Sequence, residues 1–336
     1  MSTLETNSIG KYSGNNVAVD DSLNLKSYTT TQRDALTSAT GDMIYNSTLG
    51  KVQIYGGSSW SNLGDPNVDI TFVIVAGGGG GNTNDDTAHG AGGGGGYLSN
   101  VNSENSGGGE SALPSMKVPQ STNFTVTIGA GGSSNSIGSE SRFGGLIAVG
   151  GGQGGRSFNK CGSSGSPNGR TSGGPTSGFT NNITGQGFGS GDGVATQGSG
   201  GAGGAGGAGA NGTSGQGGAG GAGVASSITG SSVTRAGGGG GGGTTGGAGG
   251  NGGGGAGGSG NNASGTSGTV NTGGGGGGSG ILTGGTPGSG GSGIVILKYP
   301  DSFTATIGSG LTSTTATSSG FKITSFTAGT DTVSFA

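Results

Sequence analysis

Glycine is the first residue type to examine, because glycine-rich loops bind phosphate groups in many proteins. Glycine makes up 96 of the 336 residues, so chance matches to a Gly-x-Gly-x-x-Gly pattern occur throughout the chain and indicate nothing. A phosphate-binding Walker loop also requires Gly-Lys followed by Ser or Thr. The two Gly-Lys pairs continue as Lys11-Tyr12 and Lys51-Val52, so neither forms such a loop.

The single histidine, His89, follows Asp85 and Asp86 in a short segment between two glycine runs. With a serine from elsewhere, these residues could form a hydrolytic set. The two carboxylates are also weak candidates for a cation site, and a solvated loop without chemistry is the third interpretation. The single cysteine, Cys161, follows Lys160, a neighbour that favours a reactive thiolate, although an unreactive thiol fits equally.

Titratable side chains are scarce in the second half of the chain. From Ser172 to Leu297 the only charged residues are Asp192 and Arg235. An active site needs several converging titratable groups. We therefore expect no catalytic residues, no cofactor and no metal centre.

The overall composition excludes several classes of protein. Leu, Ile, Val and Phe together make up about 16% of the chain, below the roughly 20% typical of an ordinary core. Strict Gly-X-Y periodicity is missing, so the chain is not collagen. A net charge of −3 with scattered cations gives no nucleic-acid-binding surface. The N-terminus lacks the features of a secretory signal, and the longest apolar stretch, Ile70 to Ala76, is too short to span a bilayer.

Composition divides the chain into three parts: residues 1–64, 65–300 and 301–336. In the first part, alternation from Gly14 to Leu25 predicts a strand with a turn. Thr31 and Asp34 are expected to cap one helical turn. Met43 to Tyr55 is predicted to form a hairpin, followed by a third short strand at Trp60 to Leu63. Such a small meander buries little apolar surface, and we expect it to pair with other chains or with the rest of the molecule.

The second part embeds a few apolar, β-branched segments in glycine. The strongest predicted strands are Ile70 to Val75, Phe124 to Ile128 and Ile294 to Tyr299, with a weaker one from Phe143 to Val149. Between them lie four uninterrupted glycine runs, at 77–81, 92–96, 237–243 and 273–278, and a period-three Gly-Gly-Ala repeat at 200–209.

Long glycine runs are either flexible linkers or ordered helices. Ordering each glycine costs roughly 0.5–1 kcal/mol more than ordering alanine, so an ordered state needs dense backbone hydrogen bonding. The extended threefold helix points its N–H and C=O groups outward, and without Cβ atoms neighbouring helices can satisfy one another. Because the runs recur among strands, we predict a bundle of polyglycine-II helices framed by β-strands. Alanines at every third position would line one helix edge, which suits an outer layer.

The residues of the second part support a family comparison. Ile70 to Ala76 followed by five glycines, Phe124 to Gly132, and Ser292 to Tyr299 resemble, in this order, the glycine-rich domain of phage tail fibres and related surface proteins. The resemblance covers about residues 65–300. It implies a mostly β fold with a polyglycine-II bundle and almost no α-helix.

The two ends of the chain carry further resemblances. Gln32 to Leu36, Gly41 to Asn46 and Trp60 to Leu63 together look like a short module of phage tail fibres and other virion appendages, and Leu4 to Val19 looks like the leader of marine-phage structural proteins. Phe321 to Ala336 is similar to a hairpin that usually precedes such a glycine-rich domain. Here it follows one, which suggests either a cap or a truncated second unit.

Three functions remain open at this stage. The resemblance implies a tail fibre or tip adhesin, located in the virion, that attaches the particle to a host receptor (a glycan or an outer-membrane protein) through loops at the helix ends. The alternatives are a purely structural fibre subunit and an ice-binding protein with a flat Ala/Thr face. We expect residues 1–64 to bind other virion proteins and the chain to form a homo-oligomer, with a trimer favoured, without nucleic-acid binding or membrane insertion.

Any receptor contacts are predicted in the excursion between residues 156 and 197, because a glycine surface offers few side chains. Aromatic and arginine side chains dominate binding energy where they occur. The alternative is that the phenylalanines fill gaps at the bundle ends. The candidate contact residues are Arg156, Phe158, Lys160, Arg170, Phe179 and Phe188.

Overall fold

The computed structural model describes residues 25–63, 67–82, 89–155, 164–165, 185–194, 197–282 and 284–336. The chain divides into two compact units, Met1–Asp65 and Pro66–Ala336, and each is considered separately. The strand predicted between Gly14 and Leu25 falls outside the described residues, apart from Leu25 itself.

The first unit is a four-stranded sheet with one short helix. The strand order is β1-β2-β3-β4, in which β2 to β4 form an antiparallel meander and β1 runs parallel to β2. The hairpin and the third strand therefore lie where the sequence predicts them, whereas β1 was not anticipated. The elements are β1 (Ser27–Tyr28), α1 (Thr30–Asp34), β2 (Met43–Asn46), β3 (Lys51–Tyr55) and β4 (Trp60–Asn62).

Helix α1 begins two residues earlier than the predicted cap allows. Thr29, not Thr31, is the N-cap: its side chain accepts from the Gln32 amide, and the Gln32 side chain accepts from the Thr29 amide. This reciprocal pair is a capping box. The prediction failed because the sequence Thr29-Thr30-Thr31 offers three candidate caps, and only the one with Gln three residues on completes the pair.

The second unit is built on a ten-stranded, mostly antiparallel sheet. Its main path is β10-β9-β8-β16-β13-β5-β6, with β7 beside β5 and with β14 and β15 beside β16. A separate hairpin, β11–β12, packs on one face. The bounds are β5 (Asn67–Val75), β6 (Tyr97–Ser99), η1 (Gly107–Gly109), β7 (Met116–Pro119), β8 (Phe124–Thr127), β9 (Ser141–Phe143), β10 (Leu146–Ala148), β11 (Val224–Ser226), β12 (Val233–Arg235), β13 (Ile294–Pro300), β14 (Ala305–Ile307), β15 (Leu311–Ser318) and β16 (Phe321–Phe335).

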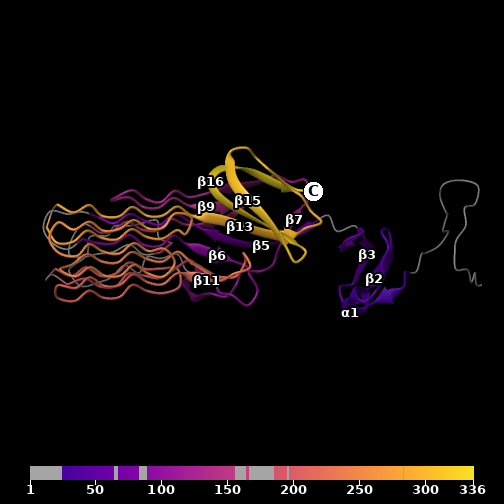
Figure 1. Ribbon diagram of the computed structural model, residues 1–336, viewed down its shortest axis with the longest axis horizontal. Helices are drawn as coiled ribbons and strands as arrows, with labels where there is room; N and C mark the ends of the chain where they lie inside the picture. Colours follow the sequence, from indigo (N-terminus) through magenta and orange to yellow (C-terminus); the bar gives the residue numbers. More distant parts are fainter. Residues whose placement is uncertain are drawn as a thin grey trace, which may run out of the picture. The chain divides into compact units, whose positions relative to one another are not determined.

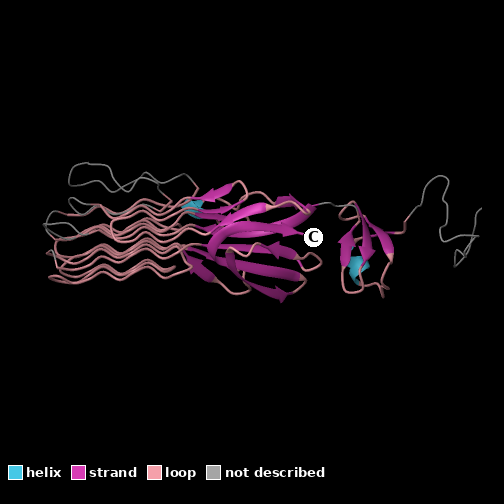
Figure 2. Ribbon diagram, turned by 90° about the horizontal axis from the view of Figure 1, so that it is seen from above, coloured by secondary structure: helices cyan, strands magenta, loops and turns pink. Residues whose placement is uncertain are grey.

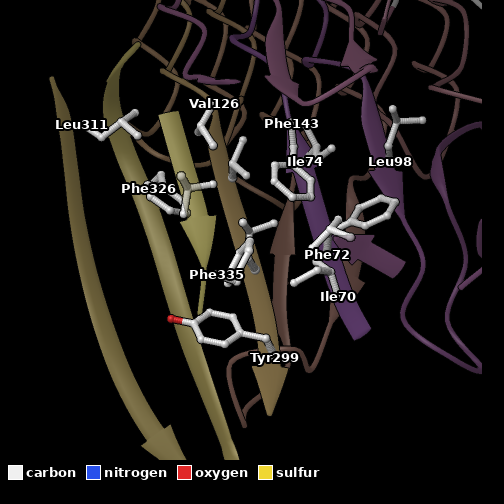
Figure 3. Close-up of a cluster of buried hydrophobic side chains, with 14 of the residues drawn as sticks. Ile70, Phe72, Ile74, Leu98, Val126, Phe143, Tyr299, Leu311, Phe326 and Phe335 are labelled. Carbon is white, nitrogen blue, oxygen red and sulfur yellow. The ribbon is translucent and has the colours of Figure 1, made fainter. Parts of the chain in front are cut away.

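The two central strands, β5 and β13, are buried on both faces. On β5, Phe72 and Ile74 face one cluster, while Val73 and Val75 face the other. The first cluster is enclosed because the long strand β16 pairs with β13 near its start and with β8 near its end, which folds the sheet around this core (Figure 3). The second cluster is covered by the β11–β12 hairpin and by neighbouring glycine-rich segments.

Two strand predictions differ from the structure. The segment from Phe143 to Val149 is not one strand: β9 and β10 form a hairpin whose turn contains Gly144 at a positive φ of 56°, a conformation glycine adopts without steric cost. The C-terminal part, 301–336, does contain a hairpin, formed by β15 and β16, but Phe321 to Phe335 is one strand of it and not a hairpin by itself. It pairs with β15 across a turn that contains Gly320, which has a φ of 80°.

The glycine runs are ordered extended helices that project together from one end of the sheet (Figure 1). Their hydrogen bonds show the threefold period directly. The amides of Gly77 and Gly80 donate to the carbonyls of Ser139 and Ser136, two residues of one neighbouring segment. The intervening amides donate to other segments. Every third residue therefore faces the same neighbour, which is the geometry of a polyglycine-II helix.

The four glycine runs are the interior of the bundle. We call residues 77–82, 89–96, 237–243 and 273–278 the inner helices. The helix at 237–243 makes backbone hydrogen bonds to six different neighbouring segments. It donates to residues 252–258, 218–221 and 89–92, and it accepts from residues 199–202, 247–250 and 275–278. Six neighbours around one helix is hexagonal packing, and it satisfies the buried backbone groups.

Outside the inner helices, alanine and polar residues occupy positions that face solvent. In the outer segment 217–223 exposure follows a period of three, and Ala219 and Ala222 are exposed. The repeat at 200–209 does not follow this expectation throughout, because Ala202 and Ala205 are fully buried. Ala202 packs against Ala91, and Ala205 joins the second apolar cluster. The segment is covered on its other side, since Gly191 and Phe188 donate to Gly201 and Gly204.

Candidate functional site

The inner helices end, away from the sheet, in a group of adjoining turns (Figure 2). We call these the far turns; their described residues are 194, 197–198, 213–216, 243–245, 259–263, 281–282 and 284–285. Backbone bridges join them in sequence: Gly198 to Gly243, Gln216 to Thr245, Gly243 to Ser259, and Asn261 to Ile281. Segments far apart in the chain thereby form one continuous end surface.

The side chains of the far turns are short, polar and uncharged. Exposed members include Gln197, Thr213, Ser214, Thr244, Asn261 and Asn262. Thr244 Oγ1 donates to Gln197 Oε1 over 3.4 Å, and Asn262 Oδ1 accepts from the Gly284 amide over 2.9 Å. Leu282, which is 48% exposed, adds an apolar side chain. Amide and hydroxyl groups both donate and accept hydrogen bonds, so this end of the bundle can recognise polar ligands.

His89 lies at the same end but is buried among the helices. Its Nδ1 is 2.7 Å from Ser279 Oγ and 2.8 Å from the Gly280 carbonyl oxygen, and its own carbonyl accepts from Ser199 Oγ over 2.8 Å. The structure thus brings a serine and the histidine together. His89 is 2% exposed and Ser279 is fully buried, so the pair joins the ends of two inner helices and is not open to a substrate. Asp85 and Asp86 lie outside the described residues.

Most of the predicted receptor-contact residues cannot be placed. Arg156, Phe158, Lys160, Arg170 and Phe179 lie outside the described residues, as does Cys161.

Phe188 is the one candidate contact that the structure describes. It is half-buried, and its Cζ would lie 3.4 Å from a Cβ added to Gly109 in the η1 turn. Its amide donates to the Gly204 carbonyl over 3.0 Å. This places Phe188 toward the sheet and away from the far turns, in a position that fits the gap-filling alternative.

A group of titratable residues lies where the bundle meets the sheet. Burial raises the pKa of Tyr97 to about 12, against a smaller opposing effect of the Ser226 hydroxyl. Burial also lowers the pKa of Arg235. Burial would raise the pKa of Glu104, but hydrogen bonds from Ser226 and Ser227 outweigh it and lower the pKa. The Ser227 amide and hydroxyl bind Glu104 Oε1 over 2.8 and 2.7 Å, which ties the β11–β12 hairpin to the loop after β6.

The described residues hold neither a metal-binding cluster nor a membrane-spanning helix. No three His, Cys, Asp or Glu side chains gather there as a metal site would require. No helix in this part of the chain is long and apolar enough to cross a bilayer.

Comparison with known proteins gives one match. A family model described as a glycine-rich domain covers residues 29–300, which is most of the chain and includes part of the first unit. No curated protein and no solved structure matches the chain.

Proposed function

We propose that this chain, which belongs to the glycine-rich domain family, is a non-enzymatic virion appendage protein. The proposed role is that of a phage tail fibre or tip adhesin. The glycine bundle would act as a rigid support, and the turns at its end would contact the host surface. The receptor class is a glycan or an outer-membrane protein.

The observation that carries this proposal is that the inner helices and the far turns expose different groups. The inner helices use their backbone groups in contacts with neighbouring helices, and their few side chains, Asn82, His89 and Ala91, are buried and so cannot reach a ligand. The far turns concentrate exposed amide and hydroxyl groups on one end surface. Binding residues commonly lie on loops that a rigid scaffold positions. Helices joined by backbone hydrogen bonds provide such a scaffold.

The test of the adhesin proposal has two parts. Immunogold labelling of purified particles with antibody against this chain should mark a tail or another surface appendage. Fluorescently labelled purified protein should bind susceptible cells saturably and compete with particle attachment. Absence of the chain from particles would reject the virion assignment. Presence in particles without cell binding would instead support a structural subunit.

The first unit is proposed to join the chain to other virion proteins, and a homotrimer is the favoured assembly. Its described part is a small four-stranded sheet whose β2–β4 strands expose Met43 and Tyr45, at 38% and 40%. Partly exposed apolar side chains on a small sheet suit an interface with another chain. Analytical ultracentrifugation of the purified full chain should show a trimer; a monomer at all concentrations would reject this assembly.

Ice binding remains a second candidate because of one surface feature. The outer helices expose small side chains at every third residue, including Ala219, Ala222, Ala248 and Ala256. Repetition at a fixed spacing is what a crystalline ligand would require. A thermal-hysteresis measurement on the purified protein decides this candidate: activity would favour it over the adhesin role, and its absence would remove it.

A further inference from the structure

The first unit contains a pocket that has no part in the proposed attachment through the far turns. The pocket measures about 340 Å³, within the range of roughly 300–1,000 Å³ that is usual for small-molecule sites. It lies between the end of α1, the segment that follows α1, and the turn that joins β3 to β4. Its walls are formed by Arg33, Asp34, Leu36, Ser38, Tyr55, Ser58, Ser59 and Trp60.

Two aromatic rings form one wall of the pocket. Tyr55 and Trp60 are directly opposite each other in the β3–β4 pairing. Their ring centroids are 5.4 Å apart, with an angle of 54° between the ring planes. Both side chains are only partly buried, so they present apolar faces toward the space they line. Partly exposed aromatic rings of this kind are common where a ligand has both an apolar and a polar side.

The pocket lining also includes an ion pair, Arg33 and Asp34, whose charges neutralise each other. Arg33 Nε and Nη2 donate to Asp34 Oδ1 over 2.8 and 2.5 Å, and Arg33 Nη1 donates to Gln53 Oε1 over 3.0 Å. Gln53 in turn binds Asn46 and Asn62, both over 2.9 Å. This network fixes the arginine in place. An anionic ligand would have to displace a bond that Arg33 already makes to Asp34 or Gln53, and the pair has no net charge to attract an ion, so an uncharged ligand fits better.

Hydrogen-bonding groups remain for such a ligand. Asp34 is 58% exposed, and among the described residues its bonds with Arg33 use only Oδ1. Ser58 and Ser59 add two hydroxyl groups to the walls.

We propose that this pocket binds a saccharide, with one sugar face against Trp60 and Tyr55 and with its hydroxyl groups bonded to Asp34, Ser58 and Ser59. A sugar ring is uncharged, has C–H groups on its faces and carries hydroxyl groups around its edge, which matches the three features of the walls. The proposal does not depend on the adhesin role, because the pocket belongs to the first unit.

The chain has a single tryptophan, so the fluorescence of Trp60 reports directly on the pocket. The probes are maltotriose, chitotriose and galactotriose, titrated into the purified full chain. We expect at least one to change the Trp60 emission saturably. No change with any of the three would overturn the proposal. A saturable change with tetramethylammonium or inorganic phosphate and none with the sugars would also overturn it.

The variant Asp34→Asn keeps Trp60 as the probe while weakening the acceptor. We expect about tenfold weaker binding of the responding sugar, which corresponds to ~1.4 kcal/mol. Asp42→Asn is the matched control, because it makes the same change at an exposed aspartate of the same unit that does not line the pocket. Unchanged emission of the sugar-free variants verifies the fold. Equal affinity of Asp34→Asn and the unmodified chain would overturn the proposed contact.

Discussion

At the scale of single residues, glycine is required where helices meet. A Cβ built on Gly240 would lie 2.1 Å from the carbonyl oxygen of Gly247, a distance that no side chain can occupy. On the helix that contains Gly247, the next residue, Ala248, is exposed to solvent. A Cβ built on Gly247 itself would lie 2.0 Å from the carbonyl oxygen of Gly218, so adjacent residues of one helix differ completely in what they tolerate, and the difference depends on direction.

This contrast gives a mutational prediction. Gly240→Val should lower the free energy of unfolding by more than about 4 kcal/mol, the range reached only by severe packing disruption. Ala248→Val is the matched control and should change it by less than ~0.5 kcal/mol, as for ordinary surface substitutions. Thermal and denaturant unfolding followed by circular dichroism measures both. Similar stabilities of the two variants would contradict hexagonal packing around residue 240.

A second prediction at this scale concerns Tyr97. Its pKa is raised from 10.0 to about 12 by burial, so the neutral phenol is favoured in the folded state. The free energy that the neutral phenol contributes to folding is fully present below pH 10 and is lost as the pH rises to about 12. The pKa shift of two units corresponds to roughly 3 kcal/mol. The unfolding free energy should therefore fall across this window by more in the unmodified chain than in Tyr97→Phe. An equal fall in both would refute it.

At the scale of elements, the sequence predicts the elements that have a local repeating pattern. It does not predict the features that depend on contacts with residues far away in the chain. The β-branched strands and the glycine helices were predictable, because each leaves a local pattern that matches its environment. The β9–β10 turn and the single long strand β16 were not predictable, since both depend on which strand lies alongside. The burial of the Ala202 side chain likewise depends on its contact with Ala91, which is more than a hundred residues away in the chain.

The candidate sites show the same limit. The excursion between residues 156 and 197 stood out by its side chains, yet Phe188 packs near Gly109 in the second unit. The pocket in the first unit was not recognised, because Arg33, Tyr55 and Trp60 come from separate elements and resemble ordinary residues of a small sheet. The Tyr55–Trp60 pairing across a four-residue turn was the one available signal.

A prediction at the element scale concerns the order of the glycine helices. The amides of Gly237 to Gly243 donate to carbonyls of neighbouring helices over 2.8–3.2 Å and are buried. Amides of this kind exchange with solvent only when the surrounding structure opens. Hydrogen exchange followed by mass spectrometry should show slow exchange for peptides covering residues 237–243 and 273–278. Fast and complete exchange there would mean that these runs act as flexible linkers.

At the scale of the whole second unit, the bundle separates support from contact. The sheet encloses the main apolar core, the inner helices extend from it through backbone hydrogen bonds, and the far turns carry the polar side chains. The sides of the bundle also expose residues, a mixture of alanines such as Ala219 and Ala248 and hydroxyl residues such as Thr266. If the protein attaches to cells as proposed, the end and the sides of the bundle should differ sharply in their sensitivity to substitution.

The same bulky substitution at the end and at the side tests this difference. Ser214 lies in a far turn, and Ala222 lies on the outer segment that follows it; both are exposed, so Trp at either position leaves the helix contacts intact. Ser214→Trp or Asn261→Trp, each covering part of the end surface, should weaken attachment to cells about tenfold, equivalent to ~1.4 kcal/mol. Ala222→Trp should leave attachment unchanged.

Attachment is measured by flow cytometry with labelled protein, and thermal unfolding verifies that each variant is folded. Loss of attachment in Ala222→Trp alone would move the contact surface to the sides of the bundle. Full attachment by both end variants would reject the far turns as the place of contact.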